Sequence, residues 1–266
     1  MGAAHIKESI KIGFSSCPND AFIFHAMSHG HVGDNNLSFE PVIEDVETLN
    51  QWAFQGILPV TKLSFHAFMK ARDTYELLDA GAAFGFGCGP LVVSREKTID
   101  FSQARVAVPG MNTTACMLLK AWRPGIRDLR AMRFDAILPA VRDGRVDAGV
   151  IIHEGRFVFE RYGCVNIIDL GQWWERETQL PIPLGCVAIR KDTETRRHKA
   201  DVERAIRASL IYARKHPDVS RPYIRSLAGE MDDAVIDAHI KLYVNDYSLS
   251  LGPDAQRVIE RLEELQ

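Results

Sequence analysis

The feature that most constrains the fold is a plan of strand, polar turn, helix, helix and strand that the chain contains twice. The first copy begins with the strand-like IKIGF, turns at SSCPND, and ends with LPVTK and the turn LSFHA. The second copy begins with RVAV, turns at PGMNTTA, and ends with VDAGVII and the turn HEGRF. Gly56 and Gly144 fall at matching places in the two copies. This repeat of order and spacing predicts two similar units, each with a small sheet and helices.

Strand-like and helix-like runs alternate along the first two thirds of the chain, which predicts an α/β fold with mostly parallel sheets. Asp45 before VETLNQWAFQ, and Pro18 in a first turn, are typical helix starts. After Lys191 the apolar residues recur at three-to-four spacing, which predicts packing helices to the end. The expected strands are Ile10–Phe14, Leu37–Val42, Leu58–Lys62, Leu91–Ser94, Arg105–Val108, Ala148–Ile152, Val165–Asp169 and Cys186–Arg190.

Composition removes several classes of partner. With 266 residues, 46% of them apolar and 25% charged, the chain can bury a sizeable core. A net charge of −3 gives no electrostatic footprint for nucleic acid. The N-terminal stretch lacks a secretory h-region and no run approaches the ~20 apolar residues of a membrane span, so no membrane partner and a cytoplasmic location are expected. Five widely spaced cysteines without a CxxC pair predict buried free thiols.

Polar residues occupy the turn after the first strand of each copy. Open α/β sheets bind ligands outside the carboxyl ends of their strands, where helix N-termini present free N–H groups. We therefore expect SSCPND and MNTTA to face one another across a cleft and to suit an oxygen-rich ligand such as a carboxylate. Two interpretations stay open: Ser16, Asn112 and Thr113 contact the ligand, or they only cap their own helices.

His153 is the candidate proton acceptor. It ends the apolar run VDAGVII, which places an imidazole at the carboxyl end of a buried strand. Its near-neutral pKa suits general-base work, although a lone histidine is more often a structural hydrogen-bonding group. Glu154 either orients this ring or stands as a solvated acid at a helix start.

Other chemistry-bearing residues give weaker signals. His25, His29 and His31 include an i, i+4 pair without a third ligand in pattern, so a helix end is favoured and no metal site is predicted. His66 and His239 are expected to pack in helices. The glycines of GFGCGP precede a strand, which indicates close backbone approach and not a dinucleotide site. Aromatic residues that either wall a ligand or fill the core are Phe65, Trp173 and Trp174.

Seven stretches, spread from about residue 10 to residue 252, carry a family resemblance. They are FSSCPNDAFIFHA, EDVETLNQWAFQGILPVTKLSFHAF, GPLVVSR, VAVPGMNTTA, GVIIHEGRF, IDLGQWWERETQLPIPLG and YVNDYSLSLG. In their order and length they resemble the 1,4-dihydroxy-6-naphthoate synthase family, the MqnD enzymes of the futalosine route to menaquinone. The resemblance implies an α/β, two-lobed periplasmic-binding-protein-like (type II) fold with a central ligand cleft. We place lobe 1 at residues 1–97 and 190–266, and lobe 2 at residues 98–189.

The resemblance also implies a reaction and its residues. The family is a carbon–carbon lyase that converts cyclic dehypoxanthinyl futalosine to 1,4-dihydroxy-6-naphthoate and releases a dihydroxyacetone fragment, with no metal or redox cofactor. The family's proton acceptor matches His153. Its substrate-binding positions match Lys62, Leu63, Ser64, Thr114 and Ala115. From the residues alone, Asn19 and Asp20 are further cleft candidates, and Lys62 either adds a cation there or reaches solvent.

The alternative from a different class is a two-lobed binding protein that captures a small carboxylic acid without chemistry. It shares the cleft and the polar turns with the lyase. His153 and the lack of export features are the sequence features that favour the enzyme. Oligomeric state stays open, with a homo-oligomer among the options.

Overall fold

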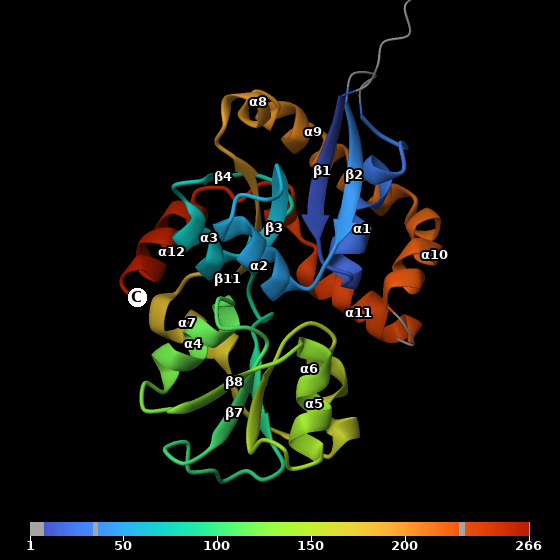
Figure 1. The fold of residues 1–266 in the computed structure, drawn as a ribbon. Coiled ribbons are helices and arrows are strands. Elements are labelled where there is room, and N and C mark those ends of the chain that lie inside the picture. Colours follow the sequence, from blue (N-terminus) through green and yellow to red (C-terminus); the bar gives the residue numbers. More distant parts are fainter. Residues whose placement is uncertain (1–7, 34–36, 229–231, 266) are drawn as a thin grey trace, which may run out of the picture.

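The computed structural model describes residues 8–33, 37–228 and 232–265, so residues 1–7 of the N-terminal stretch considered above lie outside it. Within these ranges the chain forms two lobes, each built on one β-sheet with flanking helices (Figure 1). Lobe 1 holds the N-terminal and C-terminal parts of the chain, and lobe 2 holds the middle part, drawn mainly in green and yellow in Figure 1.

The first copy of the repeated plan forms the core of lobe 1. Strand β1 (Glu8–Phe14) pairs in parallel with β2 (Leu37–Ile43) and with β3 (Val60–Ser64). Helices α1 (Pro18–Ser28) and α2 (Val46–Phe54) connect these strands. The sheet order is β2-β1-β3-β11-β4, with β5 paired to β11, and its other strands are β4 (Tyr75–Leu77), β5 (Ala83–Gly85) and β11 (Ile182–Arg190).

The second copy builds lobe 2 in the same way. Strand β7 (Arg105–Val108) pairs in parallel with β8 (Asp128–Ala131) and β9 (Ala148–Ile151). Helices α4 (Thr114–Trp122) and α5 (Phe134–Arg142) connect them, and the sheet order is β10-β6-β9-β7-β8. Because β8-β7-β9 repeats the arrangement of β2-β1-β3, the repeat predicted from order and spacing is confirmed. The remaining strands are β6 (Leu91–Ser94) and β10 (Val165–Asp169).

The prediction of mostly parallel sheets is wrong. Strand β11 pairs antiparallel with β3, β4 and β5, and β6 pairs antiparallel with β9 and β10. The chain passes from lobe 1 to lobe 2 between β5 and β6, and it returns between β10 and β11 through α7 (Leu170–Thr178). Strands beside these crossings run against the parallel strands of each repeated unit, which explains the mixed sheets.

Helices cover lobe 1 after the return crossing, as the spacing predicted. They are α8 (Thr193–Arg196), α9 (Lys199–Lys215), α10 (Pro217–Ala228), α11 (Asp233–Tyr243) and α12 (Asp254–Glu263). Along α9 the buried Val202, Ile206 and Leu210 recur every fourth residue and pack in one core cluster with Phe24 of α1. The short elements are α3 (Phe65–Ala71), α6 (Gly155–Val158) and the 3₁₀ turns η1 (Phe159–Tyr162) and η2 (Asp246–Ser248).

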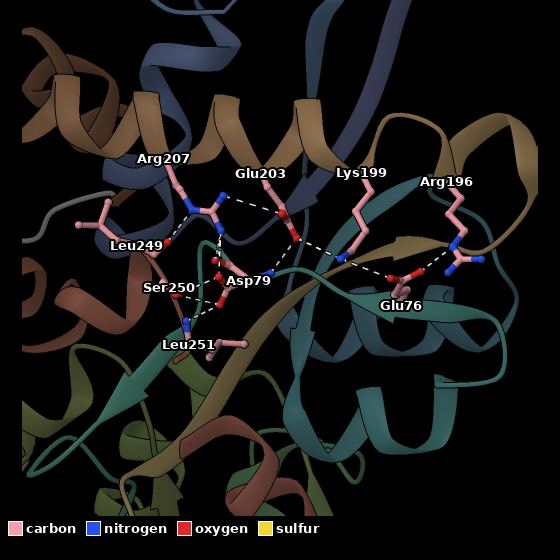
Figure 2. Close-up of polar contacts among 9 residues, drawn as sticks. All are labelled: Glu76, Asp79, Arg196, Lys199, Glu203, Arg207, Leu249, Ser250 and Leu251. Atoms are coloured by element: carbon pink, nitrogen blue, oxygen red, sulfur yellow. Dashed lines mark hydrogen bonds and ion pairs between the residues drawn. The ribbon is translucent and has the colours of Figure 1, made fainter. Parts of the chain in front are cut away.

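A polar network fixes the segment that leads out of lobe 1 (Figure 2). Asp79 accepts hydrogen bonds from the Leu251 N–H at 2.7 Å and from Arg207 Nη2 at 3.0 Å, and its own N–H donates to Glu203 at 3.1 Å. Asn245 Nδ2 also donates to the carbonyl of Phe84, a few residues after Asp79, at 2.8 Å. The YVNDYSLSLG stretch and α9 therefore anchor the chain just before it crosses to lobe 2.

Two further expectations concern the described residues. All five cysteines are buried and free, as predicted. Gly89 lies against Gly171, where an added Cβ would fall 2.2 Å from the Gly171 Cα, so the close backbone approach predicted for GFGCGP is confirmed at this position. In the part of the chain that the structure describes, no helix is long and apolar enough to cross a bilayer.

Candidate active site

A cavity of about 700 Å³ lies between the lobes, and its lining includes the expected base and the seven expected substrate-binding residues, but neither Ser16 nor Asn112. Lobe 1 supplies Asn19, Asp20, Lys62, Leu63 and Ser64 to its lining, and lobe 2 supplies Thr114, Ala115 and His153.

Strand direction explains this gathering. The cavity lining includes Ser15 just after β1, Ser64 at the end of β3, and Ile152 just after β9. These are carboxyl ends of parallel strands, which meet at one edge of each sheet and leave helix N-termini facing the opening. The two sheets present these edges to one another, so the polar turns of both repeats face a common space.

A buried ion pair lies on the lobe 1 side. The Lys62 ammonium bonds to Asp20 Oδ1, and the two residues are only 6% and 3% exposed. The other oxygen of Asp20 accepts from the Ser15 N–H at 3.2 Å and from the Ser15 hydroxyl at 2.7 Å. The alternative of a lysine reaching solvent is wrong, because the Lys62 side chain is buried and its ammonium is paired with Asp20. A desolvated ammonium needs such a carboxylate partner. Lys62 is thus a fixed cation at the cavity wall.

Asn19 connects this ion pair to helix α11. Its Nδ2 donates to Asp20 Oδ1 at 2.8 Å, and its Oδ1 lies 2.9 Å from Nε2 of His239 on α11. His239 is fully buried and does not line the cavity. It packs in a helix as predicted, and its contact with Asn19 was not foreseen.

His153 stands on the lobe 2 side with an unusual backbone. Its φ of 54° is left-handed, a conformation that non-glycine residues adopt rarely and that recurs at functional sites. Burial lowers the pKa of its imidazole from the ordinary 6.5 to about 4, Asp20 opposes this shift and Lys62 adds to it. The Phe134 ring lies 4.9 Å away between centroids. The imidazole is therefore neutral at pH 7 and able to accept a proton.

Glu154 does not orient this imidazole. No hydrogen bond joins the two side chains in the described structure, and Glu154 faces a separate surface hollow with Arg142 and Arg161. Partial burial raises the pKa of its carboxyl. Glu154 is the N-cap position of α6, so the alternative of a solvated acid at a helix start is right in position, while the carboxyl is partly buried and not fully solvated.

The N-terminus of α4 opens into the cavity. Thr113 caps it by accepting from the Cys116 N–H at 3.2 Å, so capping explains this residue. Thr114 instead joins α4 to α3 and β11: its Oγ1 accepts from the His66 N–H at 3.2 Å and donates to the Leu184 carbonyl at 3.2 Å. The N–H groups of Thr114 and Ala115 have no acceptor within the helix and lie at the positive end of its dipole. This corner suits an anion without carrying a charged side chain.

Asn112 links the lobes directly. Its Nδ2 donates to Glu47 Oε1 at 2.7 Å, and its Oδ1 accepts from Lys70 at 3.1 Å. Gly110, with φ of 151°, makes room for this contact, since an added Cβ would meet the Glu47 carboxylate at 2.4 Å. Asn112 thus neither caps α4 nor lines the cavity, and it joins the two lobes across the entrance turns.

The rest of the lining is mainly apolar. Val46, Leu49 and Leu184 contribute aliphatic surface, and Tyr243 contributes a ring from the end of α11. Trp174 and Phe65 are fully buried in the core, so the alternative that such aromatic residues fill the core is confirmed for them, and Trp173 packs beside them without lining the cavity. Burial raises the pKa of the Cys88 thiol to about 12, which keeps it protonated.

The histidines at the end of α1 form a ring cluster. His25 and His29 stack with centroids 4.4 Å apart, and His31 stacks on Tyr212 at 5.3 Å. Within the described ranges, no group of three or more His, Cys, Asp or Glu side chains is arranged to hold a metal ion.

Comparison with known proteins identifies the family. The profile of a family described as "Menaquinone biosynthesis" matches residues 10–266. A Thermus thermophilus protein named 1,4-dihydroxy-6-naphthoate synthase is 48% identical over 255 residues, which are 96% of this chain and 93% of the relative. The chain belongs to this menaquinone-biosynthesis family. A Streptomyces coelicolor protein of the same name is 40% identical over 262 residues, 96% of this chain and 92% of that one. The family resemblance inferred from the sequence is confirmed.

Solved structures agree with this membership. A crystal structure of an Archaeoglobus fulgidus protein has a TM-score of 0.90 and 37% identity, covering 97% of this chain and 96% of that one. The alkanesulfonate-binding protein SsuA of Xanthomonas axonopodis has a TM-score of 0.67 at 10% identity, covering 98% and 96%. The second likeness concerns the fold alone, and it confirms the periplasmic-binding-protein-like architecture expected for the menaquinone-biosynthesis family member.

Proposed function

We propose that this protein is a carbon–carbon lyase of menaquinone biosynthesis, which converts cyclic dehypoxanthinyl futalosine to 1,4-dihydroxy-6-naphthoate and releases a dihydroxyacetone fragment. Relatives at 48% and 40% identity over nearly the whole chain bear that enzyme name. The observation that carries the proposal is the lining of one cavity by a neutral imidazole from lobe 2 and a buried ammonium from lobe 1.

In this mechanism His153 is the general base. Its neutral imidazole takes the proton whose removal starts fragmentation, and its low pKa keeps the ring unprotonated at pH 7. Arrival of an anionic substrate raises the pKa of that imidazole, because a nearby negative charge favours the imidazolium. The base therefore strengthens when the substrate is bound.

The two sides of the cavity stabilise different negative charges of the substrate. The substrate carboxylate binds at the N-terminus of α4, where the N–H groups of Thr114 and Ala115 are free within the helix. The Lys62 ammonium and the Ser64 hydroxyl of lobe 1 stabilise the enolate-like negative charge. Asn50 holds Ser64 in place: its Nδ2 donates to Ser64 Oγ at 3.3 Å, and its Oδ1 accepts from the Ser64 N–H at 3.0 Å. Apolar residues such as Leu49, Leu63 and Leu184 exclude water from the intermediate.

The direct test is turnover. Purified protein is incubated with cyclic dehypoxanthinyl futalosine, while naphthoate absorbance and the released three-carbon fragment are followed. Formation of both products in equal amounts supports the lyase. Tight binding of the substrate without either product would overturn it and favour the two-lobed binding protein, which shares the fold.

The proposal includes the setting of the enzyme. The lobe boundaries expected from the sequence, residues 1–97 with 190–266 and residues 98–189, move to the two crossings, because β6 pairs in the lobe 2 sheet and β11 pairs in the lobe 1 sheet. The substrate is the small-molecule partner, the location is the cytoplasm, and closure of the lobes is held by the Glu47–Asn112 contact.

A further inference from the structure

A chain of buried polar groups runs from helix α11 to the cavity. His239 Nε2 lies 2.9 Å from Asn19 Oδ1, Asn19 Nδ2 lies 2.8 Å from Asp20 Oδ1, and Asp20 bonds to Lys62. The four residues are between 0% and 6% exposed. Two of the links span more than 40 positions of sequence, so tertiary structure alone creates the chain.

The direction of each hydrogen bond follows from Asp20. Its carboxylate faces the Lys62 ammonium and the Ser15 hydroxyl and N–H, all of which donate to it. An ionised carboxylate only accepts, so Asn19 must present its NH₂ group to Asp20 and its oxygen to His239. His239 must then carry its proton on Nε2 and donate it to that oxygen.

The other nitrogen of His239 agrees with this assignment. Nδ1 is buried and has no hydrogen-bond partner among the described residues. An unpartnered N–H is costly to bury, and a bare lone pair is the less costly state in an apolar setting. Neighbouring groups are the rings of His153 at 6.0 Å, Tyr243 at 4.7 Å and Phe157 at 6.3 Å between centroids. His239 is thus a neutral donor with a single hydrogen bond.

We propose that His239 is a positioning residue for the reaction. It acts through Asn19 and Asp20, and the side chain that it positions is Lys62. Without the Nε2–H, the buried Asn19 oxygen has no donor, and the side chain is held only by its bond to Asp20. Rotation of Asn19 toward another donor then withdraws its NH₂ from Asp20, the carboxylate shifts, and the ammonium moves with it. The kinetic part of this inference rests on the proposed function, and the structural part does not.

Two substitutions separate positioning from packing. In His239→Gln the amide NH₂ can replace the Nε2–H, whereas His239→Leu fills similar space and donates nothing. We expect His239→Leu to lower kcat by about 10-fold to 100-fold, the range for losing a residue that orients a functional group. We expect His239→Gln to stay within about 3-fold of wild type, since it keeps the hydrogen bond. Equal activities of the two variants would overturn the proposal.

A double substitution tests the route of action. If His239 works through Lys62, His239→Leu costs nothing further in a Lys62→Met background, because the group to be positioned is already gone. A purely structural role would instead multiply the two losses. Full multiplication of the losses would therefore contradict the inference, whatever the single variants show.

A third measurement needs no turnover and no variant that must fold. In wild-type protein labelled with ¹⁵N-histidine, the His239 ring is expected to show a protonated Nε2 and a bare Nδ1. The opposite tautomer would reverse the Asn19 amide and overturn the proposal. If the wild type fails to convert its substrate while this tautomer is found, the proposed function falls and the positioning chain stands.

Discussion

The two corners of the cleft come from one repeated unit and differ in how they handle charge. The first corner, formed by Asn19, Asp20, Lys62 and Ser64, contains an ion pair with exposures of 6% and 3%. The second, formed by Thr113, Thr114, Ala115 and His153, offers hydroxyls, free helix N–H groups and a neutral imidazole. The repeated topology thus fixes where the backbone turns, and the side chains decide which corner carries a full charge.

The difference assigns separate tasks to the corners. A buried ion pair is tolerated only if both partners and their hydrogen bonds are present, because these interactions must offset the free-energy cost of desolvating the two charges before any ligand binds. The first corner is accordingly rigid and saturated around Asp20. The second corner stays uncharged until the substrate brings a carboxylate and a proton to transfer. Substitutions in the two corners should therefore fail in different ways.

Loss of the base should have the largest effect. His153→Asn removes the proton acceptor, and asparagine tolerates the left-handed φ of 54° better than alanine does. We expect kcat to fall by about 10²-fold to 10⁴-fold with the fold retained, as is usual for a lost general base. His216→Asn, at an exposed histidine outside the cavity, is the matched control. A near-wild-type kcat in His153→Asn would remove His153 from the mechanism.

Breaking the ion pair should damage both stability and catalysis. Lys62→Met leaves the Asp20 carboxylate buried without its cation, and we expect a loss of about 3–5 kcal/mol in the free energy of unfolding. The double variant Asp20→Asn with Lys62→Met should recover most of that stability without recovering kcat. Urea unfolding and steady-state kinetics measure the two quantities. Recovery of activity along with stability would show that the ammonium has no part in the reaction.

A substitution in the second corner should weaken substrate binding and lower the free energy of unfolding only slightly. Thr114→Val removes a hydroxyl that bridges His66 and Leu184, and the neighbouring N–H groups lose alignment. We expect KM to rise by about 10-fold, equivalent to about 1.4 kcal/mol, with kcat little changed. Thr178→Val is the matched control, because its hydroxyl also accepts from an N–H and donates to a carbonyl, but on α7 away from the cavity. An unchanged KM in Thr114→Val would separate this corner from the substrate.

Local patterns predicted the parts of the fold that local interactions determine. Strands β6, β7 and β10 have the predicted ends, and Asp45 caps α2 as expected, because each is a contiguous run with its own start and stop signals. Strands β4, β5 and β8 were missed. Their sequences, YEL, AFG and DLRA, are short and contain no run of β-branched apolar residues like LVVS in β6, so they carry little strand signal of their own.

The site shows the same division. The turn residues could be predicted because strand ends and helix starts are visible in sequence. Tyr243 and His239 could not be assigned, since α11 reaches the cleft through tertiary packing against α1 and β5. One signal was available for Tyr243: it is the first residue of the YVNDYSLSLG stretch that carried part of the family resemblance.

The smallest expected effect is also the most direct comparison of the corners. Burial is the main reason that the pKa of His153 lies near 4, while Asp20 raises this pKa and Lys62 lowers it. Lys62→Met should therefore raise the pKa of His153, and Asp20→Asn should lower it. An NMR titration of the His153 ring in the empty enzyme measures both shifts, and shifts of the same sign would contradict a shared electrostatic environment.

The same titration fixes a stability window. The unfolded imidazole takes up its proton near pH 6.5 and the folded one near pH 4, so between these values the unfolded chain binds more protons. The contribution of His153 to stability is therefore present above pH 6.5 and is lost as the pH falls toward 4. Lys62→Met should raise the lower pH limit of this window, because a higher pKa of His153 in the folded state lies closer to the pKa of about 6.5 in the unfolded state. Asp20→Asn should widen it, and urea unfolding across roughly pH 3 to pH 7 would detect the opposite signs.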